Sequence, residues 1–249
     1  MSFTRELLIQ PHQTAPDLTP QAPCFCGSGK TFIECCGSIE LEREPPAGLF
    51  MFPEYLDKTT VKDILEYIKQ RPDKPLKVLD KSSTAENLSI SKNPQRVTGQ
   101  VDLGEKRQLI TDIVRESFVD LAKRCLNVEL DWFEAPDIMR YRSGGFYKGH
   151  ADSENYDSES ASWKKIIDRD LSLLLYLNDD FEGGELSFYT LRYQVWPRPG
   201  AAVMFPSDHR YVHQAETVTQ GERYAIVSWA SVKGMAKVAS QPPANAIFV

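Results

Sequence analysis

The chain changes from a helical to a strand-like pattern of apolar positions near residue 129. Upstream, two segments repeat apolar residues every three or four positions, the period of an amphipathic helix. Residues 59–70 form the first, which Thr59 or Thr60 can cap, and its stripe comprises Val61, Ile64, Leu65 and Ile68. Residues 105–125 form the second, with a stripe of Leu109, Ile110, Ile113, Val114, Phe118, Leu121, Ala122 and Cys125. We therefore expect two helices, with Cys125 as a buried core thiol.

Downstream, short runs rich in β-branched and aromatic residues alternate with Gly, Pro and Asp turns. These runs are APDIMRYR, LSLLLYLN, GGELSFY, YQVWP, AAVMFP, RYVHQAETV and RYAIVSWA. Seven or eight short strands at this spacing predict a sandwich or barrel. Two helices ahead of them fit a jelly roll with supporting helices on one face. The polar stretch 80–100 predicts a loop or weak hairpin. The acidic stretch 153–160 predicts a solvated loop, or a mobile flap that prefers a neutral or basic substrate.

Composition narrows the class of protein without naming a function. The chain has 249 residues, of which 41% are hydrophobic, as in ordinary globular proteins. Its formal net charge of −6 argues against a generally basic nucleic-acid-binding surface. No apolar run is long enough to span a bilayer, and the first residues lack the apolar core of a secretory signal. These features predict a soluble cytoplasmic protein with no nucleic-acid or membrane partner, and they leave the oligomeric state open.

Four of the five cysteines are clustered near the N-terminus in the pattern C-x-C-x8-C-C, at Cys24, Cys26, Cys35 and Cys36. A disulfide scaffold spreads its cysteines along the chain, whereas two close pairs can place four thiolates around one tetrahedral Zn²⁺. Local disulfides or free thiols are the alternative, although vicinal cysteines rarely bridge each other. The stretch PCFCGSGKTFIECCG also resembles the SEC-C zinc motif. That resemblance implies a small protein-binding zinc knuckle whose partner is unknown.

A proline pair follows this cluster and suggests a domain boundary. Because Pro45-Pro46 cannot continue a helix, the stretch around it reads as a linker. We therefore divide the chain into a Pro-rich lead-in with the zinc knuckle at 1–45 and a second domain at 46–249, with its core at about 100–232.

The histidines suggest a second metal site. In an extended strand His150 and Asp152 point to the same face, because side chains two positions apart share a face. With one distant histidine they can form a facial triad, which suits Fe(II) because open coordination positions remain. Taken alone, the His-x-Asp motif is weak, because it is more often just a His and an Asp at a strand end. Arg223 lies ten residues after His213 and can pair a carboxylate bidentately, as lysine cannot.

Residues 100–232 resemble the prolyl 4-hydroxylase-like branch of the Fe(II)/2-oxoglutarate oxygenases. Five blocks carry the resemblance in order. They are YRSGGFYKGHAD, RDLSLLLYLNDDFEGGELSFY and VWPRPGAAVMFPSD, followed by His213 and by Arg223, with Trp229 behind them. The family resemblance implies a double-stranded β-helix, or jelly roll. It also implies an enzyme that uses Fe(II), 2-oxoglutarate and O2, with ascorbate as reductant, and that couples hydroxylation to formation of succinate and CO2.

The resemblance also assigns roles to individual residues. The iron ligands it implies are His150, Asp152 and His213. Arg223 would hold the C5 carboxylate of 2-oxoglutarate with help from Tyr176, and Tyr141 would lie near the cosubstrate or the substrate. His209 has the wrong spacing to Arg223 and is assigned to a loop.

The substrate is the least constrained expectation. The resemblance and the zinc knuckle together favour a prolyl, or other, residue within a protein, because a tethered docking module raises the effective concentration of a macromolecular target. The same chemistry on a free amino acid or other small molecule is the alternative. A non-catalytic zinc-knuckle adaptor, or a ribosome-associated binding protein, is the alternative from another class. An adaptor has no need to keep two histidines, an aspartate and a clamp arginine together.

Overall fold

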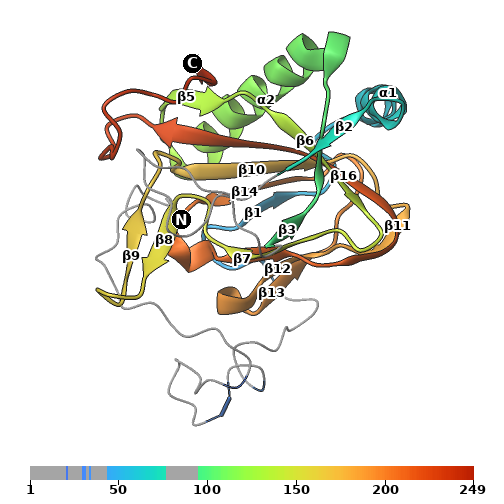
Figure 1. Ribbon diagram of the computed structural model, residues 1–249. Coiled ribbons are helices and arrows are strands. Elements are labelled where there is room, and N and C mark those ends of the chain that lie inside the picture. The colour runs from blue at the N-terminus through green and yellow to red at the C-terminus, as the bar shows by residue number, and fades with distance from the viewer. Residues whose placement is uncertain (1–20, 22–29, 32–33, 35–43, 77–94) are drawn as a thin grey trace.

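The computed structural model describes residues 44–76 and 95–249, together with four isolated residues in the N-terminal segment. The predicted zinc ligands Cys24, Cys26, Cys35 and Cys36 lie outside the described residues, as does most of the polar stretch 80–100. Within the described part the protein is mainly β, as the sequence pattern predicts, and Figure 1 shows its strands stacked into two layers.

The larger sheet has ten strands and forms one wall of the molecule. They are β1 (Phe50–Phe52), β2 (Asp73–Pro75), β4 (Gly99–Val101), β5 (Leu130–Glu134), β6 (Asp137–Arg142), β10 (Leu171–Tyr176), β11 (Phe181–Gly183), β14 (Ala202–Pro206), β16 (Val218–Val232) and β17 (Ala246–Phe248). The main order is β1-β14-β10-β16-β6-β4-β2, and every pairing is antiparallel. The long strand β16 lies between β10 and β6.

A smaller sheet of five strands faces it. They are β3 (Arg96–Val97), β7 (Phe146–His150), β12 (Leu186–Phe188), β13 (Tyr193–Val195) and β15 (His213–Ala215), in the order β13-β12-β15-β7-β3. Two facing antiparallel sheets with crossing connections form the jelly roll that the sequence predicts. The space between the sheets holds the candidate site.

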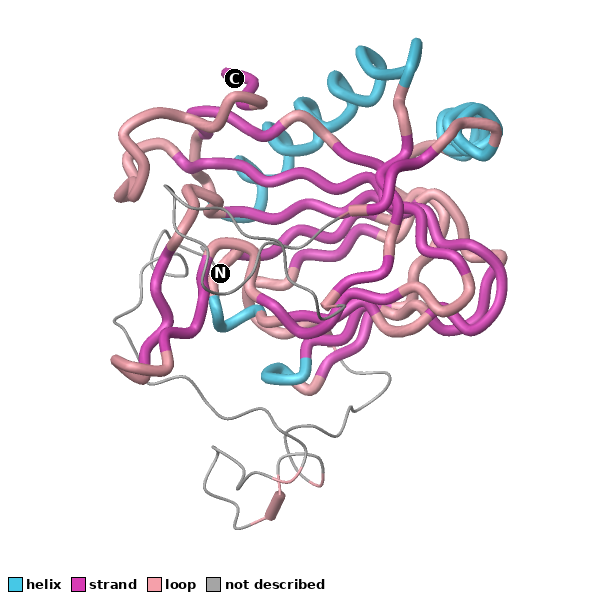
Figure 2. Tube along the Cα trace, in the orientation of Figure 1, coloured by secondary structure: helices cyan, strands magenta, loops and turns pink. Residues whose placement is uncertain are grey.

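Two helices cover the outer face of the larger sheet (Figures 1 and 2), namely α1 (Lys58–Lys69) and α2 (Arg107–Leu121). Short 3-10 turns lie at η2 (Gly104–Lys106), η4 (Tyr189–Leu191) and η5 (His209–Tyr211), and a π turn, η3 (Ala122–Leu126), extends α2. Ile64, Ile110 and Phe118 from the helices are completely buried in one core with Leu171 and Leu175 of the sheet. Burying each such side chain contributes about 1.5–3 kcal/mol.

The predicted helices form, but some details were wrong. Asp57 caps α1 in place of Thr59 or Thr60, because its carboxylate accepts hydrogen bonds from both of their N–H groups. Leu109 is 40% exposed and does not belong to the buried stripe of α2. Cys125 is only half-buried, although burial still raises the pKa of its thiol.

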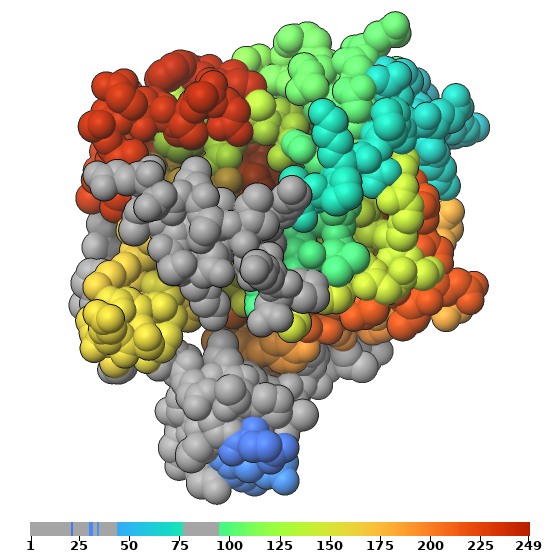
Figure 3. Space-filling model, in the orientation of Figure 1, coloured from blue at the N-terminus to red at the C-terminus, as the bar shows by residue number. Residues whose placement is uncertain are grey.

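The acidic stretch 153–160 is not a simple loop. It contains β8 (Glu154–Asp157), which pairs with β9 (Ser162–Lys165) in a two-stranded hairpin. This hairpin stands at the surface and is yellow in Figure 3. Its base is held because the N–H of Ser153 donates to the carbonyl of Ser207, and Ile166 donates to Ser153. No helix in the described part of the chain is both long and apolar enough to cross a membrane.

Candidate active site

A pocket lies between the two sheets and is open at one side. Its space, including the part open to solvent, is about 470 Å³. Residues from both sheets and from the segment after β7 form its walls. The polar and aromatic side chains that line it are Arg96, Tyr141, Tyr147, His150, Asp152, His213, Arg223 and Trp229. Most of the predicted site residues therefore meet in one cavity.

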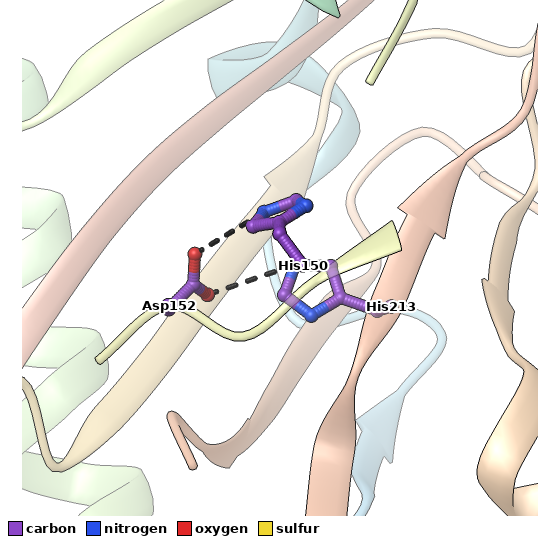
Figure 4. A group of neighbouring side chains, drawn as sticks. All are labelled: His150, Asp152 and His213. Atoms are coloured by element: carbon purple, nitrogen blue, oxygen red, sulfur yellow. Dashed lines mark ion pairs between the residues drawn. The ribbon is translucent and has the colours of Figure 1, made fainter. Parts of the chain in front are cut away.

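His150, Asp152 and His213 lie together at this pocket, as Figure 4 shows. Their ligand atoms all lie within 4.8 Å of one another. The Nε2 atom of His150 is 3.4 Å from Asp152 Oδ1, and Nε2 of His213 is 3.6 Å from Oδ2. Two imidazole nitrogens and one carboxylate on the same side of a metal position form the donor set of a facial triad.

Strand pairing brings the two histidines side by side. His150 ends β7 and is directly opposite His213, which begins β15. The sequence analysis expected Asp152 to share an extended strand with His150, and this was wrong. Asp152 lies in a bend after β7, and its carboxylate reaches the histidines from the bend.

Backbone carbonyls orient both imidazole rings. Nδ1 of His150 lies 2.9 Å from the carbonyl oxygen of Lys148, and Nδ1 of His213 lies 3.0 Å from that of Tyr211. A carbonyl only accepts, so each Nδ1 carries the hydrogen and donates it. The Nε2 atoms, which face Asp152, therefore keep free lone pairs. This is the arrangement in which histidine binds a metal and in which outer contacts fix the ring.

Two hydroxyl groups support the aspartate. Ser172 Oγ donates to Asp152 Oδ2 at 2.7 Å, and it also lies 2.7 Å from Ser207 Oγ. Arg169 is placed nearby because it pairs with Glu134 and stacks 3.7 Å from the ring centroid of Trp229. These contacts hold the carboxylate in one orientation before any metal binds.

The protonation states suit metal binding. Burial opposes the charged form of Asp152, but the adjacent His213 and His150 outweigh it and hold the pKa of Asp152 far below its ordinary value. Burial lowers the pKa of His213 to about 4, against the attraction of Asp152. At neutral pH the site therefore presents an ionised carboxylate and an unprotonated His213, the forms that bind a cation.

Arg223 is the most deeply buried charge at the pocket. Its side chain comes from β16 and is only 1% exposed. No carboxylate among the described residues pairs with it, and its Nε makes no hydrogen bond. Its only described hydrogen bond runs from Nη2 to the hydroxyl of Tyr176 at 3.4 Å. A buried guanidinium without a counterion is costly, so this end of the pocket suits an anion that the described residues do not supply.

Tyr141 and Tyr176 lie on either strand next to β16 and flank Arg223. The guanidinium carbon is 4.8 Å from the ring centroid of Tyr141 and 5.2 Å from that of Tyr176. Burial raises the pKa of Tyr176, so its hydroxyl stays protonated and can donate to an anion. Gly184 also matters here, because its φ is +69° and a Cβ would lie 3.1 Å from Cδ of Arg223.

His209 is not part of this arrangement, as its spacing predicted. Its Nδ1 is 2.6 Å from Glu154 Oε2, and its ring stacks with Trp163 at a centroid distance of 5.7 Å. His209 thus ties the β8–β9 hairpin to η5 and serves the structure.

Three residues that line the pocket or contact Asp152 were not among the predicted site residues. Ser172 shares the inner face of β10 with Tyr176, and the two-residue alternation of a strand could have revealed it. Arg96 left no comparable signal, because it lies in the stretch read as a loop. Arg169 begins the block RDLSLLLYLNDDFEGGELSFY, but its pairing with Glu134 joins residues that are far apart in sequence.

We expect Ser172→Ala to lower the affinity of the triad for Fe(II) by about 10- to 100-fold, because loss of an outer contact to a metal ligand has that effect. Metal titration of the purified variant measures it. Ser117→Ala is the matched control, since Ser117 is equally buried but donates to the carbonyl of Ile113 in α2, on the helix side of the larger sheet. Equal metal affinity in both variants would show that Ser172 does not position Asp152.

Comparisons with known proteins agree with this geometry. Residues 136–231 match the sequence model of the 2OG-Fe(II) oxygenase superfamily, and residues 22–38 match that of the SEC-C motif. The chain is 38% identical to human prolyl 3-hydroxylase 2 over 89 residues, which are 32% of this chain and 13% of that protein. It is 46% identical to chicken prolyl 3-hydroxylase 1 over 66 residues, or 24% of this chain and 9% of that protein. The chain thus spans only a small part of these relatives.

Solved structures share the fold at low sequence identity. A prolyl 4-hydroxylase from Pseudomonas putida is 20% identical, with a TM-score of 0.54 over 75% of this chain and 94% of that chain. A prolyl hydroxylase from Trichoplax adhaerens, solved with a hypoxia-inducible-factor peptide fragment, is 20% identical, with a TM-score of 0.52 over 74% and 83%. These likenesses establish the jelly-roll fold.

The fold is a jelly roll, and residues 136–231 within it match the 2OG-Fe(II) oxygenase superfamily. Over this segment the chain is similar to prolyl hydroxylases, and residues 22–38 are similar to the SEC-C motif.

Proposed function

We propose that this protein is an Fe(II)- and 2-oxoglutarate-dependent hydroxylase that acts on a prolyl, or other, residue in a protein. The observation that carries the proposal is the pairing of the His150–Asp152–His213 donor set with the buried, unpaired Arg223 in one pocket. The donor set suits Fe(II), and the buried arginine suits a dicarboxylate. Neither feature is needed by a protein that only binds a partner.

The donor set fits the metal that the superfamily implies. Bound Fe(II) would supply the activation of O2 that oxidises 2-oxoglutarate to succinate and CO2 and hydroxylates a C–H bond. The chain holds that metal through His150, Asp152 and His213. Ascorbate would act as an external reductant.

The cosubstrate end of the pocket fits 2-oxoglutarate. Arg223 can pair its C5 carboxylate bidentately, and Tyr176 can donate a further hydrogen bond. Tyr141 packs against the guanidinium and keeps water from it. Together these three residues would hold the dicarboxylate at this end of the pocket.

A protein substrate is supported by two features. The relatives in the comparisons are named as prolyl hydroxylases, and one solved neighbour holds a peptide. The SEC-C motif at residues 22–38 adds a candidate docking module, and tethering such a module favours a macromolecular target. Hydroxylation of a free amino acid is the alternative with the same site. We place the reaction in the cytoplasm.

The test is a comparison of lysate proteins incubated with Fe(II), 2-oxoglutarate and either the wild-type protein or its His150→Ala variant. We expect peptides that gain the mass of one oxygen atom only with the wild type, and fragmentation should place the gain on proline. A gain on free amino acids alone would favour the small-molecule alternative. No gain and no succinate would favour the non-catalytic adaptor.

We further propose that Cys24, Cys26, Cys35 and Cys36 bind one structural Zn²⁺. Thiolates favour Zn²⁺, whereas the histidine–carboxylate site keeps open positions for Fe(II). We expect elemental analysis to find about one zinc per chain after mild chelation has emptied the triad. The Cys35→Ser/Cys36→Ser double variant should lose that zinc and keep 2-oxoglutarate turnover, while Cys125→Ser is the control that keeps both. Loss of turnover in the double variant would make the knuckle part of the catalytic fold.

A further inference from the structure

A second arginine, Arg96, lines the pocket and has no role in the reaction as described so far. It lies on β3, at the edge of the smaller sheet, directly opposite Tyr147 of β7. Arg223 belongs to the opposite wall. The pocket therefore has a guanidinium on each of its two sheets, and only one of them is accounted for by 2-oxoglutarate.

The contacts of Arg96 leave its hydrogen-bonding capacity largely unused. Its Nη2 donates to the thioether sulfur of Met139 at 3.0 Å, which is a weak acceptor. Its Nε is buried and has no hydrogen-bond partner. The guanidinium carbon lies 4.5 Å from the ring centroid of Tyr147. These contacts hold the side chain in place without giving its N–H groups a strong hydrogen-bond acceptor.

No carboxylate of the described residues forms an ion pair with Arg96. Asp137 lies near enough to interact electrostatically with Arg96. Burial raises the pKa of Asp137, and the positive charge of Arg96 offsets part of that rise, but Asp137 accepts its hydrogen bond from Gln100. Once 2-oxoglutarate is bound at Arg223, Arg96 remains a half-buried cation beside the pocket. Such a charge is costly unless a ligand pairs with it.

Arg96 is also close to the reacting end of the pocket. Tyr147, whose ring it contacts, stacks on the imidazole of His150 with ring centroids 3.6 Å apart and an angle of 18°. Arg96 is thus separated from a predicted metal ligand by one aromatic ring. A group bound there belongs to the molecule that is oxidised.

We propose that Arg96 binds a carboxylate of the substrate, so that the oxidised residue carries or adjoins an acidic group. This inference rests on the proposed function and names its substrate class. A carboxylate matches the planar guanidinium bidentately, whereas an amide carbonyl offers one neutral acceptor. The carboxylate belongs either to an acidic side chain near the oxidised residue or to a terminal or free α-carboxyl group.

The acidic hairpin does not contradict this preference, although its composition suggested a neutral or basic substrate. Three of the four carboxylates in 152–159 are already engaged. Asp152 faces the two histidines, Glu154 pairs with His209, and Asp157 pairs with Lys164. Little acidic charge is left to select a cation.

The experiment uses synthetic peptides in which one proline is flanked, at successive positions, by aspartate or glutamate, by asparagine or glutamine, or by lysine. Free L-proline and a peptide ending in proline test the α-carboxyl source. The full-length protein with Fe(II) and 2-oxoglutarate is assayed for hydroxylation in air and for binding of fluorescent peptides without O2. The variants are Arg96→Gln, Arg96→Glu and the control Lys74→Gln, which removes an exposed charge from β2.

We expect the wild type and Lys74→Gln to bind an acidic peptide about 10- to 100-fold more tightly than its amide counterpart, the range typical of a hydrogen bond to a charged group. Arg96→Gln should abolish that preference, and Arg96→Glu should favour lysine in the same position. A different result is that the wild type binds only free proline or the proline-terminated peptide tightly, and that this binding is lost in Arg96→Gln. That result supports the inference and identifies the α-carboxylate as the group that Arg96 binds.

Equal binding of acidic and amide ligands by the wild type would overturn the inference, as would an unchanged preference in Arg96→Gln. A failure of the proposed function can be told apart from a failure of the Arg96 inference. If nothing is hydroxylated in air, the proposed function fails, and the binding measurement without O2 still decides whether Arg96 selects a carboxylate.

Discussion

Replacing His213 with alanine is expected to lower 2-oxoglutarate conversion by more than about 100-fold, since loss of an outer contact to a metal ligand alone costs about 10- to 100-fold. His213 faces Asp152 through Nε2 and is almost completely buried, so no other described side chain can take its place. The same loss is expected for His150→Ala. Succinate formation and Fe(II) binding, measured on the same preparation, should fall together.

His209→Ala is the matched control for this prediction. His209 lies four residues before His213 but pairs with Glu154 outside the triad. The variant should keep most of its turnover while loosening the β8–β9 hairpin. If His213→Ala and His209→Ala retain equal turnover, the triad does not hold the metal.

Replacing Arg223 with alanine is expected to raise the KM for 2-oxoglutarate by about 30-fold or more. Truncating one partner of a buried, hydrogen-bonded charge pair costs about 2–5 kcal/mol, and each 1.4 kcal/mol is a factor of about ten. Binding of Fe(II) should change little, because Arg223 does not contact the triad. Arg223→Lys should recover only part of the affinity, since lysine offers a point charge in place of a planar fork.

Arg142→Ala is the control for charge alone. Arg142 lies on β6, next to β16, but its side chain is half exposed and bonds to Asp73 on the outer side of the sheet. The KM of the Arg142→Ala variant for 2-oxoglutarate should match that of the wild type. An unchanged KM in Arg223→Ala would remove the clamp from the account and leave the buried guanidinium unexplained.

Local sequence patterns were sufficient for most of the fold. The apolar period of α1 and α2 and the short strands after residue 129 predicted a mainly β jelly roll with two supporting helices. The ordered motifs around His150, Tyr176, His213 and Arg223 predicted residues that the structure brings to one pocket. Such motifs are readable because each places its functional residue at a fixed position on a strand, and strands that are neighbours in the sheet then bring these positions together.

What the sequence did not reveal depends on contacts between distant segments. Asp152 is held in its bend by Ser172 and by Ser207, and no local pattern links the three. Arg96 lies on a two-residue strand whose pairing with β7 is visible only in the folded sheet. The acidic stretch forms β8 because β9 pairs with it, and polar residues in a hairpin give no apolar period to read.

The most direct test of the central claim follows the two atoms of O2. The full-length protein is incubated with Fe(II), 2-oxoglutarate, a peptide that it hydroxylates and dioxygen labelled with heavy oxygen. The account predicts one labelled atom in succinate and one in the hydroxylated peptide, with both labels lost in His213→Ala. Product hydroxyl groups labelled from water, or label that persists in His213→Ala, would contradict an oxygenase reaction at the His150–Asp152–His213 site.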